Sequence, residues 1–488
     1  MDVNSPLKQL LFDFKQYKNL TKSTIEILPS SGQTDYKGGS KISFTLPYAS
    51  AISLEDLAFS FNFQCTDSSG APGILKGKTA PIAGNDLCCT FAPKDIASII
   101  EEVDVKVNGQ TIQHLTSYND LVNLMNFLQD EKSVSNLLQN TDIPNKSMVA
   151  KNASNETVVT KFNEGFKFNS DLTDENLQTD EYLSDKRKFI INQWFGLLGK
   201  RGKETSSNFI DTNMLGEVVI SFVLAKPNVL FYGLSTTPTE ATKIVADIVS
   251  QKTTSNIGYT LQDCKLSMVR YNFPSAYSDS IASQLNSGTK YTIAFNHYET
   301  RSTLAIQSAG TIRWNENSRD IKHIIAYFTD STRHNSIKPS EFNQVSETSN
   351  YFNYGNVHHE HSQFQVGSVM MPQNAQNTHE SFLELTRSVP EMRGNKKHEM
   401  FNKIKSIDEW ANTCFMAYLS LEMVEGVKLD ESKLLSGLSS EQLPISMVYK
   451  YKNRNMATGD VWEKNVNVMT VSTRLLVVEK GQNCYVEI

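Results

Sequence analysis

The chain has 488 residues, of which 39% are hydrophobic and 10% aromatic, and its formal net charge is −6. A single hydrophobic core stops growing at about 250–300 residues, so this length predicts two domains of comparable size. A mildly acidic chain is poorly suited to neutralising many phosphates, which disfavours direct nucleic-acid binding as the main function. No run of about 18 apolar residues is present, which excludes a membrane-spanning helix of the ordinary kind.

The six cysteines are sparse and show no CxxC spacing. Free thiols in a reducing compartment are therefore favoured over disulfides. The first residues lack the basic and then apolar run of a signal peptide, so we expect synthesis and folding in the cytosol or nucleus. The cysteines are Cys65, Cys88, Cys89, Cys264, Cys414 and Cys484.

Alternation of apolar and polar residues recurs along the chain and predicts strands with one buried face. Long loops rich in Ser, Asn, Thr and Gly separate these strands, for example residues 66–86 and 140–185. The pattern predicts an all-β sandwich architecture. The clearest alternating stretches are residues 42–46, 57–63, 103–107, 291–295, 415–423 and 471–477.

Two short helices are expected. Ser5 and Pro6 suit the start of an amphipathic helix whose apolar stripe is formed by Leu7, Leu10, Leu11, Phe14 and Tyr17. A second helix is predicted over residues 115–128, where apolar residues recur at helical spacing. It follows an Asn108-Gly109 pair, which is typical of a tight hairpin turn.

The chain divides near its middle, where a Ser/Thr/Pro segment follows a strand-like stretch. We predict an N-terminal arm with the short helix at residues 1–39 and a first sandwich at residues 40–232. A linker at residues 233–258 and a second sandwich at residues 259–488 complete the division. The two halves share no residue-level repeat.

Motifs of known enzymes are not matched. Residues 196–203 resemble a phosphate-binding loop but lack its first Gly and its Ser or Thr, so a flexible basic turn is expected. His358, His359 and His361 form the densest histidine cluster, and a solvated loop is favoured over a metal site because real ligands converge from separate elements. The acidic stretch at residues 171–181 lacks the ligand pattern of a calcium loop. We predict no catalytic residues, no metal and no cofactor.

Three segments together resemble the double jelly-roll major capsid proteins of Polinton-like viruses, virophages and related large DNA viruses. The first runs from Phe91 to Gln110 and ends in Val-Asn-Gly-Gln, and the second includes Tyr118-Asn119-Asp120-Leu121. The third runs from Phe209 to Pro227 and contains Leu215-Gly216-Glu217-Val218. The resemblance covers the first half by motif and the second half by length and strand content. Within it, Gly216 is expected to mark a bulge or a close backbone approach.

This resemblance implies two tandem eight-stranded jelly-roll β-sandwiches with long loops and a few short helices. It also implies a non-enzymatic subunit of the virion that forms homotrimeric, pseudo-hexagonal capsomers in an icosahedral shell. The expected partners are its own copies, neighbouring capsomers, and penton and minor capsid proteins, without sequence-specific nucleic-acid binding. An internal membrane is a further candidate partner. Synthesis is expected in the host cytoplasm, and assembly in the cytoplasm or nucleus.

Two alternatives remain open from the sequence. A two-sandwich carbohydrate-binding protein would present exposed aromatic residues on its loops, whereas Trp194, Trp314, Trp410 and Trp462 are scattered. A jelly-roll enzyme such as a cupin-type oxygenase would need converging histidine and carboxylate ligands, whereas the dense histidines lie in one short segment.

Overall fold

The structure is a computed structural model. It describes residues 21–48, 50–54, 56–67, 74–75, 86–87, 89–91, 95–127, 146–151, 157–162, 187–199, 209–233, 257–305, 309–330, 352, 354, 359–393, 407, 410–411, 414–421, 437–440, 443–451, 464–479 and 483–487. The predicted amphipathic helix at residues 5–17 and residues 234–256 of the predicted linker (residues 233–258) lie outside these ranges.

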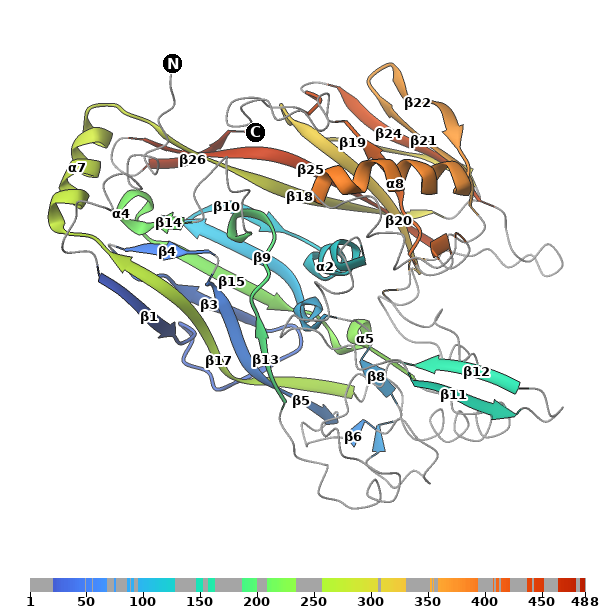
Figure 1. The fold of residues 1–488 in the computed structure, drawn as a ribbon, viewed down its shortest axis with the longest axis horizontal. Helices are drawn as coiled ribbons and strands as arrows, with labels where there is room; N and C mark the ends of the chain where they lie inside the picture. Colours follow the sequence, from blue (N-terminus) through green and yellow to red (C-terminus); the bar gives the residue numbers. More distant parts are fainter. Residues whose placement is uncertain are drawn as a thin grey trace.

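The first half of the chain forms two facing sheets (Figure 1). The four-stranded sheet has the order β10 (Gln110–Leu115), β9 (Ile100–Val107), β15 (Val218–Leu224) and β3 (Lys41–Thr45). The seven-stranded sheet has the order β13 (Arg187–Ile191), β5 (Ala58–Asp67), β17 (Ile257–Asn272), β4 (Ala51–Ser53) and β14 (Phe209–Asp211), and β1 (Thr21–Ile27) and β2 (Asp35–Lys37) both pair with β17.

The second half forms two further sheets. One has the order β18 (Tyr291–Ala305), β25 (Lys464–Glu479), β20 (Ile321–Asp330) and β23 (Ala417–Ser420), and β26 (Asn483–Glu487) pairs with β25. The other has the order β19 (Ala309–Asn315), β24 (Pro444–Tyr451), β21 (His359–Val366) and β22 (Val369–Gln376). Eight consecutive strands, β18 to β25, thus divide equally between these two sheets, and each step along the chain changes sheet except the β21–β22 hairpin, as in a jelly roll.

Short helices and small two-stranded sheets decorate the sandwiches. The small sheets pair β6 (Ile74–Leu75) with β7 (Asp86–Leu87), β8 (Cys89–Phe91) with β16 (Phe231–Gly233), and β11 (Lys146–Lys151) with β12 (Thr157–Phe162). The helices are η1 (Ile96–Ile99), α2 (Tyr118–Phe127), η4 (Gly196–Leu198), α4 (Thr212–Leu215), α5 (Pro227–Leu230), α7 (Ser275–Asn286) and α8 (Thr378–Arg393).

Aromatic side chains fill the space between the sheets of each sandwich. In the first, the Phe222 ring lies 5.2 Å from Phe59 and stacks on Trp194 at 5.1 Å. The Trp194 indole donates to the Leu57 carbonyl at 2.9 Å, so its buried polar atom is satisfied. In the second, Phe415 packs on Trp410 at 4.9 Å. The strands at residues 42–46, 57–63 and 103–107 bury alternate apolar side chains as predicted. The alternation predicted for residues 471–477 is wrong, because Ser472 and Leu476 are fully buried. The predicted all-β, double jelly-roll fold is confirmed.

Several local predictions can be compared directly. The helix predicted over residues 115–128 is α2, which begins at Tyr118 and ends at Phe127. Asn108 and Gly109 have φ values of 50° and 80°, the pair of positive angles that the predicted tight turn requires. The alternation predicted for residues 415–423 is wrong, because residues 415–419 are all buried. Helix α8 packs against β23 and covers the face that would otherwise be wet.

Strand β17 connects the two halves in a way that the sequence pattern did not indicate. It lies in the range predicted as the start of the second sandwich, yet it pairs with β5, from Ile257 opposite Asp67 to Ser267 opposite Ala58. It also pairs along its last seven residues with β1, which lies in the range predicted as the N-terminal arm. The larger sheet of the first sandwich therefore includes residues 21–27 and extends to Asn272.

Candidate functional site

Helix α2 lies where the first sandwich meets the second (Figure 1). Its first turn carries a buried carboxylate, Asp120. Asp120 is 2% exposed and accepts hydrogen bonds from the hydroxyls of Tyr354 at 2.8 Å and Tyr327 at 3.1 Å. Both tyrosines belong to the second half, and their rings meet edge to face at 5.1 Å. One carboxylate of the first sandwich thus binds two side chains of the second.

The position of Asp120 explains how a carboxylate tolerates this burial. It lies in the first turn of α2, where unpaired backbone N–H groups and the helix dipole favour negative charge. A buried charge is costly unless hydrogen-bonded donors surround it, and the two phenol groups serve as such donors. Removing either hydroxyl therefore weakens the attachment of the second sandwich to α2.

A second contact is centred on Gln113 of β10, which is 1% exposed. Its amide nitrogen donates to the Asn296 carbonyl of β18 at 3.3 Å, and its amide oxygen accepts from the Leu197 N–H of η4 at 2.6 Å. Beside it, the Phe195 ring packs edge to face on Tyr298 at 6.1 Å. Strand β10, helix η4 and strand β18 are thereby held together by one amide and one aromatic pair.

A third contact joins α7, which follows β17, to α4. The Tyr277 hydroxyl donates to the Asp211 carboxylate at 2.9 Å, and the Ser278 hydroxyl donates to the Asn213 side chain at 2.9 Å. Asp211 also caps α4 by accepting from the Asn213 N–H at 2.9 Å. Burial raises the pKa of the Asp211 carboxyl, although its hydrogen bonds to Asn213 and Tyr277 oppose this.

These three contacts define the junction of the two sandwiches. Each one pairs a buried polar side chain with partners that are far away in the sequence, so the two sandwiches are fixed in one orientation by directional bonds. Such polar pairs specify geometry more than they add stability. The junction holds and orients its parts.

The residues singled out in the sequence do not gather at this junction. His359 lies on β21 and is 7% exposed, so the prediction of a solvated loop is wrong for this residue. Its ring packs on Phe415 at 4.6 Å, and burial lowers its pKa to about 4. His361 is half-buried on the same strand, and His358 lies outside the described residues. Within the described ranges no group of three or more acidic, His or Cys side chains is arranged to hold a metal ion.

The segment that resembled a phosphate-binding loop is structural. Residues 196–198 form the buried helix η4, so the expected flexible turn is wrong for this part, and residues 200–208 lie outside the described ranges. The acidic stretch at residues 171–181 also lies outside them. Cys264, Cys414 and Cys484 are buried free thiols. None of the helices that the structure describes has the length and apolar character needed to cross a membrane.

Sequence reasoning missed the junction residues. Asp120 was quoted within a resembling motif but without a role, and Gln113, Asp211, Tyr327 and Tyr354 were not singled out. The available signal was weak: polar residues between strongly apolar neighbours, whose partners are 66 to 234 positions away.

Comparison with known proteins extends the fold assignment. No protein-family model matches the chain, and no curated protein matches it. Solved structures do match over almost its whole length. The capsid of PBCV-1 virus has a TM-score of 0.55 at 12% identity and covers 97% of both chains. The Sputnik virophage structure has a TM-score of 0.53 at 11% identity, covering 96% of this chain and 88% of the other.

The Faustovirus major capsid protein has a TM-score of 0.52 at 8% identity, covering 94% of this chain and 90% of the other. At these identities the similarity concerns the fold, and it includes both sandwiches and their connection. The chain thus has the double jelly-roll fold found in major capsid proteins of large DNA viruses.

Proposed function

We propose that this chain is a major capsid protein, a structural subunit that assembles as homotrimeric capsomers in the icosahedral shell of a DNA virus. The observation that carries the proposal is the fixed junction between two complete sandwiches, in a fold that matches the PBCV-1 capsid over 97% of both chains. A subunit that tiles a shell needs a constant shape, and the junction provides one by directional buried bonds.

A two-sandwich subunit supports the proposal of a trimer. Three copies around a three-fold axis present six similar sandwiches, which approximates a hexagon and packs against like neighbours on a curved sheet. Its partners would be neighbouring capsomers together with penton and minor capsid proteins. The chain would be made in the host cytoplasm, assembled in the cytoplasm or nucleus, and located in the virion.

The carbohydrate-binding alternative has no supporting observation. Trp194, Trp314 and Trp410 are buried in the sandwich cores, and Trp462 lies outside the described residues. Buried indoles contribute to packing and present no face to a sugar. Tryptophans that serve only to pack the cores are consistent with a structural subunit.

The experiment is to purify the full chain and measure its mass by native mass spectrometry at sub-micromolar concentration, with negative-stain imaging of the same sample. Stable trimers with a hexagonal outline are expected, because permanent interfaces bury on the order of 2,000–5,000 Å². A monomer at that concentration, or a trimer without six-fold-like outline, would overturn the proposal.

A further inference from the structure

The second sandwich contains a buried carboxyl group that the proposed function does not use. Glu316 follows β19 and is 4% exposed. One of its carboxyl oxygens has no hydrogen-bond partner. The Thr470 hydroxyl of β25 lies close enough to favour the charged carboxyl, but it donates to the Glu299 carbonyl at 3.4 Å. A carboxylate with so few donors is costly to bury in its charged form.

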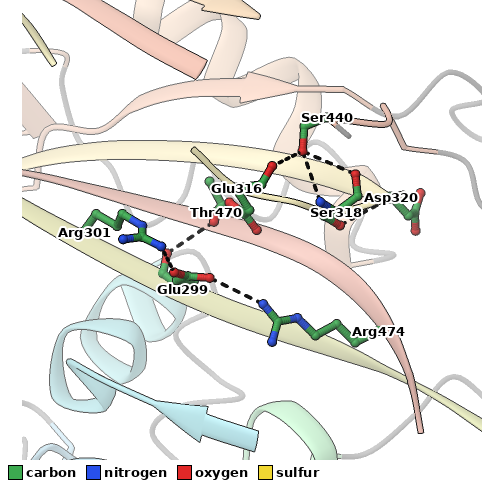
Figure 2. Close-up of polar contacts among 8 residues, drawn as sticks. All are labelled: Glu299, Arg301, Glu316, Ser318, Asp320, Ser440, Thr470 and Arg474. Carbon is green, nitrogen blue, oxygen red and sulfur yellow. Dashed lines mark hydrogen bonds and ion pairs between the residues drawn. The ribbon is translucent and has the colours of Figure 1, made fainter. Parts of the chain in front are cut away.

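Charged groups from two strands face this carboxyl. Glu299 and Arg301 come from β18, and Arg474 comes from β25 (Figure 2). Both arginines bond to Glu299, Arg474 at 3.4 Å, so Glu299 takes the donors that could otherwise pair with Glu316. Among the described residues no ion pair joins Glu316 to either arginine.

These surroundings determine the pKa of Glu316. Burial is the largest influence, and the negative charge of Glu299 acts in the same direction, whereas the two arginines oppose it. The result raises the pKa of the Glu316 carboxyl to about 7, compared with an ordinary value of 4.5. The group therefore changes its charge close to neutral pH.

The backbone of the same residue is tied to a distant segment. The turn of residues 316–320 is held by the segment Gly437–Ser440, whose Ser440 hydroxyl donates to the Glu316 carbonyl (Figure 2). The Ser440 N–H donates to the Ser318 carbonyl at 2.8 Å, and the Leu438 N–H donates to the Ile321 carbonyl at 2.9 Å.

The contact at Gly437 is tight as well. Its N–H donates to the Asp320 carboxylate, and an added Cβ would lie 2.4 Å from the Ile321 carbonyl oxygen. The segment and the turn therefore fit together only in this arrangement. A backbone movement at Glu316 that brings water to its carboxylate would also displace the carbonyl that Ser440 binds.

We infer that Glu316 acts as a proton-dependent latch, which keeps the segment Gly437–Ser440 closed on the 316–320 turn while its carboxyl is protonated. When the carboxyl ionises, hydration of the charge competes with the closed arrangement and the segment opens more often. The inference rests on contacts within the second sandwich, so it stands or falls independently of the capsid assignment.

The pH dependence of stability is determined by the difference in proton binding between the folded and unfolded states. The pKa of the folded state is higher than that of the unfolded state, so the protonated carboxyl contributes stability that is fully present below pH 4.5 and is lost as the pH rises through about 7. Between pH 6 and pH 8 the protection of the segment should fall about tenfold. The melting temperature should fall by about 3 to 5 °C over the same range.

The test is hydrogen–deuterium exchange of the full chain at pH 6 and pH 8, corrected for intrinsic exchange, on peptides that contain residues 437–440. Melting curves are recorded in parallel. Glu316→Gln keeps the shape of the side chain but cannot ionise. In this variant the exchange protection should no longer change tenfold between pH 6 and pH 8, and the melting temperature should no longer shift. Glu217→Gln makes the same atomic change at an exposed site and should behave like the wild type.

A further variant tests whether hydrogen–deuterium exchange detects opening of the segment Gly437–Ser440. Gly437→Ala displaces the segment by collision without changing any charge, and it should raise exchange at both pH values. If Gly437→Ala raises exchange but the wild type is equally protected at pH 6 and pH 8, the latch is refuted. It is refuted too if Glu316→Gln keeps the full pH dependence of the wild type.

Discussion

The side chain of Asn108 encloses Gly216. Its amide nitrogen donates to the Leu215 carbonyl at 2.9 Å, and its amide oxygen accepts from the Glu217 N–H at 3.0 Å. Two segments that separately resembled the capsid family, the Asn-Gly turn and the Leu-Gly-Glu-Val segment, therefore meet in the folded chain. Gly216 was expected to mark a bulge or a close backbone approach within its strand; instead the Asn108 side chain approaches it, and Gly216 lies between α4 and β15.

This contact leads to a first prediction. Gly216 has a φ of +84°, and an added Cβ would lie 2.5 Å from the amide oxygen of Asn108. Gly216→Ala should lower the free energy of unfolding by about 2–4 kcal/mol, through left-handed strain and collision together. Chemical denaturation of the full chain measures this.

Gly39 provides the matched control for that measurement. Its φ is +83°, but nothing lies within 4 Å of an added Cβ. Gly39→Ala should cost only about 1–2 kcal/mol, the strain alone. Equal losses in the two variants would show that the Asn108 contact has no energetic consequence.

A second prediction concerns the junction. Tyr354→Phe removes a hydroxyl that donates to the buried Asp120 carboxylate, so it should cost about 1–3 kcal/mol. Tyr48→Phe changes the same atom at a tyrosine that is 68% exposed and should cost less than about 0.5 kcal/mol. Thermal melting of both variants measures the two losses of stability. If Tyr354→Phe causes no loss, the Asp120 carboxylate is satisfied without this bond.

Features determined by neighbouring residues were predictable from the sequence, whereas contacts between distant residues were not. The Asn108-Gly109 turn, helix α2 and the alternating strands were predictable, because their signals lie within a few neighbouring residues. The placement of β17 in the first sandwich was not, because its hydrophobic pattern suits either sandwich and only its partners β5 and β1 decide. Asp120 was missed for the same reason, since Tyr327 and Tyr354 lie 207 and 234 positions away.

The burial of His359 shows a related difficulty. Residues two apart on a regular strand share a face, but the pairing of β21 with β24 is irregular between His359 and His361, so these two imidazoles differ in burial. Here Phe415 covers one of them. The cluster of histidines is thus divided by the sheet, with His359 buried and His361 half-buried on β21.

A third prediction follows from three buried histidines of the second sandwich. Burial lowers the pKa of His297 and His323 to about 3 and that of His359 to about 4. Because these folded-state values are below the unfolded value near 6.5, the stability that neutral imidazoles contribute is present above pH 6.5. It is lost as the pH falls toward 4.

For His359 alone the loss between pH 7 and pH 5 should be about 2 kcal/mol. His359→Gln should flatten this part of the acid limb in melting experiments from pH 7 to pH 5. His379→Gln changes an exposed histidine of α8 and provides the control. An acid limb that stays unchanged in His359→Gln would contradict a buried neutral imidazole at this position.

The last prediction concerns residues 1–20, which precede β1 and include the expected apolar stripe of Leu7, Leu10, Leu11, Phe14 and Tyr17. The predicted amphipathic helix is too short to be stable alone in water, so we expect its stripe to be buried against another surface. Our hypothesis is that this surface belongs to the assembled shell: a neighbouring capsomer, a minor protein or an internal membrane. Deleting residues 1–20 should therefore leave folded trimers with a near-normal melting temperature but impair shell assembly.

Strand β1 supplies the control for this deletion. Removing residues 1–27 also removes seven residues that pair with β17, from Thr21 opposite Asn272 to Ile27 opposite Leu266. That longer deletion exposes the edge of β17 and removes the partly buried Ile25 and Ile27 from the core, so it should lower the melting temperature by several degrees, at least about 4 °C. Native mass spectrometry and melting curves distinguish the two. If the shorter deletion already prevents folding or trimer formation, the stripe packs on its own subunit and the hypothesis is wrong.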